Sequence, residues 1–261
     1  MSTSSVYPDT TGTAFAIARR LGYDGVELMV GIDPTSTDVD AVERLRDYHE
    51  MPVLSVHAPT LLVTQRIWGP DPWEKLERSA RAATRLGADV VVVHPPFRWQ
   101  RGYASGFVQG IRALTESTGI TFTVENMYPW RGPGGGEVRP YSPGWDPSDV
   151  DYDHLTLDLS HASTARQQSL DLVHDWGERL RHVHLTDGTG LTTDEHLLPG
   201  DGDQRAADVL RTIAGQGYPG HVVVEASTRR AADRAHQEAQ LHGALQFART
   251  HLAVPLREVT R

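Results

Sequence analysis

Short apolar segments alternate with longer amphipathic segments along most of the chain. The short ones have the length and β-branched content of buried strands, and we expect strands at 25–29, 53–57, 89–94, 121–126, 156–161, 181–186 and 221–226. A further strand is expected near 4–7, at the start of the chain. Strands that alternate with helices predict a parallel sheet with crossover helices.

The longer segments predict the helices between these strands. Their apolar positions recur at helical spacing, and the expected ranges are 11–21, 39–50, 72–86, 104–117, 164–177, 204–215 and 229–251. Eight strand–helix units need about 250 residues, and the chain has 261 residues. We therefore predict an α/β fold in which residues 1–261 form one domain, a single (β/α)₈ TIM barrel.

Residues 128–151 interrupt this alternation. They contain a glycine-rich run at 131–136 and the aromatic residues Tyr128, Trp130, Tyr141 and Trp145. Such composition predicts a long loop. Long loops on the catalytic face of a barrel often cover the substrate, so we expect a lid over the active site, with a static surface loop as the alternative.

The composition limits which metal ligands and which binding partners are possible. The chain has no cysteine, so a bound metal must be held by nitrogen and oxygen, and 13 histidines are available. The formal charge of −9 gives no global attraction for nucleic acid, which leaves a local arginine patch as the one route to such binding. The sequence lacks a long apolar span and a secretory signal at residues 1–7, and we expect a cytoplasmic protein that binds no membrane.

Alternation within the strands predicts which side chains point into the barrel. In the segment 121–125 the apolar Phe122 and Val124 must face the helices, which directs Glu125 inward. The same reasoning directs Asp158, Ser55 and His57 inward. Collecting the strand ends and one following loop gives nine candidate ligands on one rim: His57, His94, Glu125, Asp158, His161, His184, Asp194, His196 and Glu225.

This gathering of nine side chains favours a metal site. A single histidine at a strand end is more often structural, but nine coincidences on one rim are difficult to explain in that way. Four carboxylates without cations would repel one another and take up protons. One to three divalent ions would relieve this repulsion, with Zn²⁺ the first expectation and Mn²⁺, Co²⁺ or Fe²⁺ as alternatives. His182 alternates with His184 and is expected one layer deeper, in a supporting role.

Several motifs resemble the superfamily that joins xylose isomerase-like sugar isomerases and epimerases with endonuclease IV, also described as AP endonuclease family 2. They are Val124-Glu125-Asn126, Leu157-Asp158-Leu159-Ser160-His161, His182-Val183-His184-Leu185-Thr186-Asp187, Pro199-Gly200-Asp201-Gly202 and Val224-Glu225. The resemblance covers essentially the whole chain. It implies that Glu125, Asp158, His184 and Glu225 form a single-metal site, with Glu125 and Glu225 as catalytic acid and base.

The two branches of this superfamily give different expectations. The segment Asp194-Glu195-His196 resembles endonuclease IV, which implies a three-zinc cluster that uses all nine ligands. Residues 22–28 are typical of the sugar isomerase branch instead. Residues 29–38 form no Arg- and Gln-rich loop for gripping DNA, and Thr186 replaces the asparagine common in the nuclease.

The sequence thus leaves three functions open. We favour an isomerase or epimerase of a sugar, polyol or sugar phosphate, because fold and ligands alone do not fix the reaction and the substrate loops are isomerase-like. The alternative is a multinuclear phosphoester hydrolase, and the third is a non-catalytic metal-binding protein. A small sugar or phosphoester is the expected partner, and the oligomeric state is left open. Expected substrate contacts are Arg98, Asn126, Trp130, Arg131 and His182.

Overall fold

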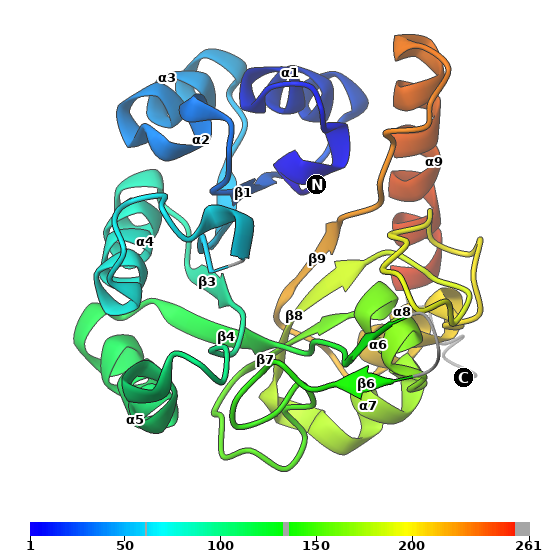
Figure 1. Ribbon diagram of the computed structural model, residues 1–261. Coiled ribbons are helices and arrows are strands. Elements are labelled where there is room, and N and C mark those ends of the chain that lie inside the picture. Colours follow the sequence, from blue (N-terminus) through cyan, green and yellow to red (C-terminus); the bar gives the residue numbers. More distant parts are fainter. Residues whose placement is uncertain (61, 133–135, 254–261) are drawn as a thin grey trace, which may run out of the picture.

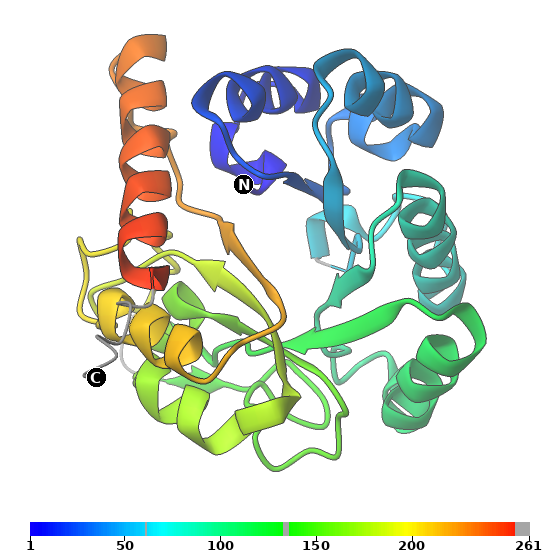
Figure 2. The same cartoon turned by 180° about the vertical axis from the view of Figure 1, so that it is seen from behind.

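Seven parallel strands form a nearly closed barrel surrounded by helices (Figures 1 and 2). The structure is a computed structural model that describes residues 1–60, 62–132 and 136–253. In spatial order the strands are β1 (Val26–Met29), β2 (Val53–His57), β3 (Val90–Val93), β4 (Thr121–Glu125), β7 (Leu155–Asp158), β8 (Leu180–Leu185) and β9 (His221–Val224). This arrangement confirms the predicted α/β barrel.

Helices cover the outside of the sheet. The longer ones are α1 (Thr11–Leu21), α3 (Val39–His49), α4 (Pro72–Leu86), α5 (Arg101–Thr118), α7 (Ser169–Trp176), α8 (Ala206–Gly215) and α9 (Arg234–Leu252). Short elements are α2 (Pro34–Thr37), α6 (Leu159–Ala165) and the 3₁₀ helices η1 (Thr3–Val6), η2 (Leu62–Thr64) and η3 (Gly177–Arg179). Asp71 caps the start of α4 and Gly87 ends it with a positive φ of 80°, as helix-capping preferences predict.

The strand expected near residues 4–7 is wrong. Residues 3–6 form η1, and the parallel pairing at this edge is reduced to a bridge between Ser2 and Glu27. The backbone N–H of Ser2 also donates to the carbonyl of Val224 at 2.8 Å, so this residue connects β1 with β9. Hydroxyl groups explain the change, because the side chain of Ser2 accepts from the N–H of Ser4 and favours a local turn over a strand.

Three further elements differ from prediction. The strand expected at 156–161 ends at Asp158, whose carboxylate accepts from the N–H of His161 at 2.7 Å and so starts α6. Arg166, with a positive φ of 63°, ends α6, and this divides the expected helix 164–177. The last helix begins at 234, after the capping residue Asp233, instead of at 229. Both aspartates cap helices through their side chains.

The barrel interior is polar, whereas the layer between sheet and helices is apolar. Phe122, Leu157 and Val183 face the helices and are buried in the main hydrophobic core. Inside the barrel, the hydroxyl of Thr156 donates to that of Thr123 at 2.7 Å. The predicted alternation therefore holds, and it directs the ionisable side chains to the centre of the barrel. Among the described residues, no helix is long and apolar enough to cross a membrane.

Candidate metal centre

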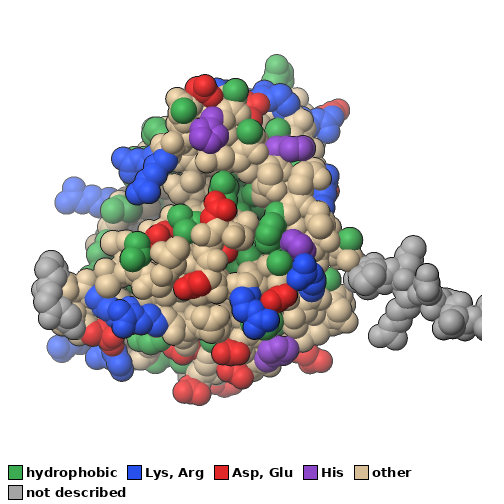
Figure 3. Space-filling model, turned by 90° about the vertical axis from the view of Figure 1, so that its right-hand side faces the viewer, with side chains coloured by type: hydrophobic (Ala, Val, Ile, Leu, Met, Phe, Trp, Pro, Cys, Tyr) green, Lys and Arg blue, Asp and Glu red, His purple; other side chains and the backbone are tan. Residues whose placement is uncertain are grey.

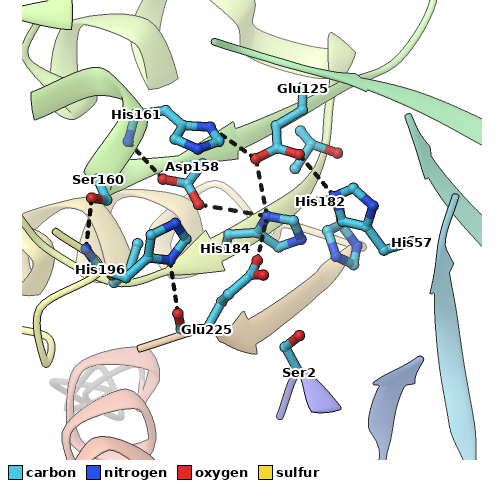
Figure 4. Close-up of polar contacts among 12 residues, drawn as sticks. Ser2, His57, Glu125, Asp158, Ser160, His161, His182, His184, His196 and Glu225 are labelled. Atoms are coloured by element: carbon cyan, nitrogen blue, oxygen red, sulfur yellow. Dashed lines mark hydrogen bonds and ion pairs between the residues drawn. The ribbon is translucent and has the colours of Figure 1, made fainter. Parts of the chain in front are cut away.

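The nine side chains predicted as ligands lie together at the carboxyl ends of the strands. We call them the rim cluster, and several are drawn in Figure 4: His57, His94, Glu125, Asp158, His161, His184, Asp194, His196 and Glu225. Most are at or just beyond the last residue of a strand, so the parallel sheet itself brings them together.

Glu125 occupies the centre of the rim cluster. Its Oε2 lies 3.1 Å from Nε2 of His57 and 3.0 Å from Nε2 of His94. Its Oε1 lies 3.0 Å from Nδ1 of His161 and 3.3 Å from Nδ1 of His184. One carboxylate thus joins two pairs of histidines that come from different sides of the barrel.

Glu225 approaches the same region from β9. Its Oε2 lies 2.8 Å from Nδ1 of His184, the nitrogen that also approaches Glu125. Its Oε1 accepts a hydrogen bond from the hydroxyl of Ser4 at 3.0 Å. Both glutamates therefore face one ring nitrogen, and Glu225 is connected in addition to η1.

Asp194 and His196 complete the rim cluster from the loop after β8. The Oδ2 of Asp194 lies 2.8 Å from Nε2 of His196 and 3.2 Å from Nε2 of His161. The hydroxyl of Ser160 donates to Asp194 and accepts from the N–H of His196 at 2.9 Å. His196 has a positive φ of 46°, which costs free energy in a residue other than glycine. The surrounding contacts hold the loop despite this cost.

The turn that follows this loop requires glycine at position 202. A Cβ on Gly202 would lie 2.2 Å from the carbonyl oxygen of Gly188, so no side chain fits there. The carboxylate of Asp187 accepts from the N–H groups of Gly200 and Gln204 at 3.0 and 3.1 Å. These contacts fix the loop that presents Asp194 and His196.

A second group of polar side chains lies deeper in the barrel and consists of Glu27, Ser55 and His182. We call it the lower group. Glu27 Oε2 accepts from the hydroxyl of Ser55 at 2.8 Å and lies 2.8 Å from Nε2 of His182. Its Oε1 lies 3.0 Å from Nε2 of His184, the ring nitrogen that points away from Glu125. All three side chains of the lower group are fully buried.

Glu27 was missed as a site residue by the sequence reasoning. Its signal was available, because Val26 and Leu28 are apolar and face the helices, which directs Glu27 inward. Glu27 lies inside β1 and not at its carboxyl end, so the pattern of strand-end residues does not include it.

Burial and ionic contacts shift the pKa values of these groups in opposite directions. Burial alone would raise the pKa of Glu125, but the neighbouring His184, His94 and His161 hold it well below its usual range. Burial lowers the pKa of His182 despite the contact with Glu27. Burial also opposes protonation of His196, yet Asp194 raises its pKa to about 10.

The donor set fits a divalent metal ion. Four groups of three ligand residues have donor atoms within 4.8 Å of one another, and the groups containing Glu125 bring it together with His57 and His94, and with Asp158 and His184. Buried Oδ2 of Asp158 and Nδ1 of His94 have no hydrogen-bond partner among the described residues. Imidazole and carboxylate donors suit Zn²⁺ and other first-row ions.

The residues expected to contact substrate have different surroundings. Both ends of the Asn126 amide bind the backbone of Asp158, at 2.7 and 3.0 Å. His182 belongs to the lower group. Arg131 donates to the carbonyl of Thr164 at 2.6 Å, and Arg98 donates to that of Tyr141 at 3.3 Å. Asn126 therefore positions the turn at Asp158, and substrate contact by any of these residues stays a prediction.

The segment 128–151 contains a short antiparallel pair, β5 (Trp130–Arg131) and β6 (Glu137–Val138). Residues 133–135 lie outside the described part. Tyr141 packs with Phe97 and Met127 in a small core, against which Trp130 and Trp145 also pack. Tyr128 differs, because its ring centroid lies 5.0 Å from that of His161. Tyr128 therefore contacts the rim cluster through His161, and a covering role for the segment stays a prediction.

Basic side chains are scattered on the face drawn in Figure 3. They stand singly or in small groups among acidic residues there. Many arginines pair with acids, as Arg112 does with Asp153 at 2.8 Å. This distribution offers no continuous basic track on that face for a nucleic-acid duplex.

Comparison with known proteins places these features in a family. The family model described as xylose isomerase-like TIM barrel matches residues 15–251. An uncharacterized protein of Mycobacterium tuberculosis (strain H37Rv) is 49% identical over 270 residues, which cover 97% of this chain and 96% of the relative.

Two solved structures share the fold at low sequence identity. A D-tagatose 3-epimerase-like protein has a TM-score of 0.66 and 23% identity, covering 97% of this chain and 98% of that one. An AP endonuclease, family 2, from Brucella melitensis has a TM-score of 0.66 and 17% identity, covering 92% and 95%. The resemblance noted in the sequence is confirmed: the chain belongs to the xylose isomerase-like TIM barrel family.

Proposed function

We propose that this chain is a divalent-metal-dependent epimerase or isomerase of a small sugar, polyol or sugar phosphate. One observation carries the proposal: Glu125 and Glu225 both approach Nδ1 of His184, at 3.3 and 2.8 Å, inside a buried set of metal-type donors. Two carboxylates on one centre can remove a proton from carbon and return it. The D-tagatose 3-epimerase-like neighbour supports the same reaction class.

The ion would be held by Glu125, Asp158, His184 and Glu225, as the family resemblance implies. When bound, it polarises the substrate carbonyl and makes the adjacent C–H more acidic. One glutamate removes the proton from that carbon. For epimerisation, the other glutamate delivers a proton to the opposite face of the same carbon. For isomerisation, the proton is returned to the former carbonyl carbon, while the proton of the adjacent hydroxyl moves to the former carbonyl oxygen. Burial of the site excludes water, which strengthens these electrostatic effects.

Solvent-deuterium exchange tests this proposal directly. The metal-loaded protein is incubated in D₂O with ketohexoses, aldoses and ketone derivatives of cyclic polyols, and deuterium on the carbon next to the carbonyl is measured by NMR. We expect exchange with at least one of these sugars. Glu225→Gln should lower its rate by about 10²–10⁴-fold, whereas Glu116→Gln, a change on the exposed face of α5, should leave it unchanged. Unaltered exchange in Glu225→Gln would refute the assigned chemistry.

A phosphoester hydrolase is the second candidate, and the contacts of Asp194 with His161 and His196 favour it. These contacts add a third group of donors, which a single-metal isomerase does not need. Elemental analysis separates the two functions. One ion per chain contradicts the three-metal hydrolase, whereas two or three ions together with cleavage of bis(p-nitrophenyl) phosphate would replace the isomerase proposal.

A double variant, Asp194→Ala with His196→Ala, sharpens this result. If metal content falls while sugar exchange survives, the third group of donors takes no part in catalysis. A folded, metal-loaded protein that acts on neither sugars nor phosphoesters would instead favour a non-catalytic metal-binding role.

A further inference from the structure

A cavity of about 590 Å³ lies beside the rim cluster. It is bordered by η1, by the segment after β1 and by the residues after β2. Ser4 lines this cavity, and its hydroxyl donates to Glu225 Oε1 at 3.0 Å. Ala58, the residue after His57, lines it from the other side. The cavity therefore adjoins the proposed acid–base site through Ser4 and is large enough for a substituted sugar.

The mouth of this cavity is apolar and exposed. Tyr7, Ile32 and Val63 line it with exposed fractions of 45%, 66% and 77%. Large apolar side chains gathered around one concave surface usually mark a binding site for an apolar group. Met29 and Val30 extend the apolar lining further in.

The charges in the cavity disfavour an anion. Its described lining contains no lysine, arginine or histidine, but it contains the carboxylates of Asp9 and Asp33. The N–H of Thr11, at the start of α1, is already taken by Asp33 Oδ2 at 2.6 Å. A phosphate here would meet a carboxylate and would lose its hydration without a cationic partner.

Two arginines contact residues of this lining from outside the cavity. Arg229 lies over the ring of Tyr7, with its Cζ 5.5 Å from the centroid, and lines a neighbouring cavity. Arg234 pairs with Asp9 at 3.0 Å. Neither arginine belongs to the described lining of the cavity beside Glu225.

We propose that this cavity binds the part of the substrate remote from the reacting carbon, and that this part is uncharged and carries an apolar group. The substrate class is then an unphosphorylated sugar with an alkyl or aryl substituent that keeps a carbonyl next to the reacting carbon, such as a glycoside with a ketone on its ring. This inference rests on the proposed function for the position of the reacting carbon. It narrows the sugar or sugar-phosphate class to the unphosphorylated members.

Binding of matched ligands to the metal-loaded protein tests the inference without requiring turnover. Calorimetry compares methyl, hexyl and phenyl β-D-glucoside, D-glucose and D-glucose 6-phosphate. Each methylene that becomes buried tightens binding by up to about fourfold. We expect the hexyl glucoside to bind at least about tenfold more tightly than the methyl glucoside, and glucose 6-phosphate to bind more weakly than glucose.

Variants of exposed cavity residues test whether the gain in affinity from the alkyl chain arises in the cavity. Ile32→Ser and Val63→Ser replace exposed side chains, so folding should be unaffected, and each should remove several-fold of the gain from the alkyl chain. Leu191→Ser is the matched control, because Leu191 is 53% exposed and lies outside the cavity lining. Ile32→Lys should improve the binding of glucose 6-phosphate relative to glucose.

The outcomes separate this inference from the proposed function. Equal affinity along the alkyl series, including no measurable binding of any member, overturns the inference, as does tighter binding of glucose 6-phosphate than of glucose. Deuterium exchange into an unsubstituted sugar without any alkyl gain would leave the proposed function standing alone. An alkyl gain lost in Ile32→Ser, without exchange into any sugar, would support the cavity's specificity and contradict the reaction.

Discussion

The rim cluster and the lower group both contain buried glutamate and histidine but differ in their access to a cavity. In the lower group, Glu27 bonds Ser55 and His182, and all three side chains are fully buried. Both regions contain buried polar atoms without a hydrogen-bond partner among the described residues, such as Glu27 Oε1 in the lower group and Asp158 Oδ2 in the rim cluster. In the rim cluster, however, Glu225 connects to a cavity through Ser4, so a ligand can approach these donors, whereas the lower group is enclosed in the barrel.

His184 belongs to both regions, and its removal should have the largest effect. The ring places Nε2 3.0 Å from Glu27 and Nδ1 2.8 Å from Glu225. In the metal-free protein, His184→Ala leaves buried carboxylates without their partner and should lower the free energy of unfolding by about 3–5 kcal/mol. Metal content should fall as well. Chemical denaturation and elemental analysis measure the two effects.

A matched control for this variant is His221→Ala. His221 is only partly buried and pairs with the exposed carboxylate of Asp89, so its loss should cost no more than about 1 kcal/mol. If both variants lost equal stability and both retained their metal, His184 would have no special place between the two regions.

Glu27→Gln should have an intermediate effect, on metal affinity. Glu27 holds Nε2 of His184 and so directs Nδ1 toward Glu125 and Glu225. Loss of a carboxylate that orients a metal-binding histidine commonly lowers metal affinity by about 10–100-fold. Competition with a chelator measures the affinity, and Ser55→Ala, which removes only a neighbouring hydroxyl, should change it less. Unchanged affinity in Glu27→Gln would reduce the lower group to a purely structural role.

The pH dependence of stability should distinguish His196 from His182. In the metal-free protein the pKa of His196 is raised to about 10 by Asp194. Its contribution to folding stability is therefore complete below about pH 6.5 and is lost as the pH rises toward 10. Burial lowers the pKa of His182, so its effect has the opposite sign and reduces stability in acid.

NMR titration of the two imidazoles, with denaturation of the metal-free protein at pH 6 and pH 9, measures this difference. We expect His196 to remain protonated at pH 8 and His182 to remain neutral at pH 7. This pH effect on stability should be smaller than the effects of His184→Ala and Glu27→Gln. His196 is partly exposed, and water screens its contact with Asp194. A neutral His196 at pH 8 would contradict the assigned ion pair.

Strand alternation predicted the position of the rim cluster because a parallel barrel brings all inward-facing strand ends to one layer. Glu125 and His57 are found where that rule places them. The rule failed at residues 4–7, where the hydroxyl of Ser2 forms local hydrogen bonds with Ser4 in place of strand pairing. It also gave no account of His161, which reaches the cluster from α6 after Asp158 caps that helix.

The remaining features depend on tertiary contacts that no local pattern encodes. The amide of Asn126 binds the backbone of Asp158. The position of Asn126 after Glu125 in the sequence does not predict this contact. The cavity beside Glu225 is formed by three separate segments, within residues 3–11, 29–36 and 58–64. Tyr141 packs into a small core with Phe97 instead of standing free over the site.

The central position of Glu125 has a consequence for how metal ions would load. One of its oxygens faces His57 and His94, and the other faces His161 and His184. Two ions bound on these two sides would share a single carboxylate, whose negative charge can be neutralised only once. The first ion would fix its rotamer and withdraw its electron density. Successive binding constants should therefore differ, and a metal titration should deviate from the curve of identical, independent sites.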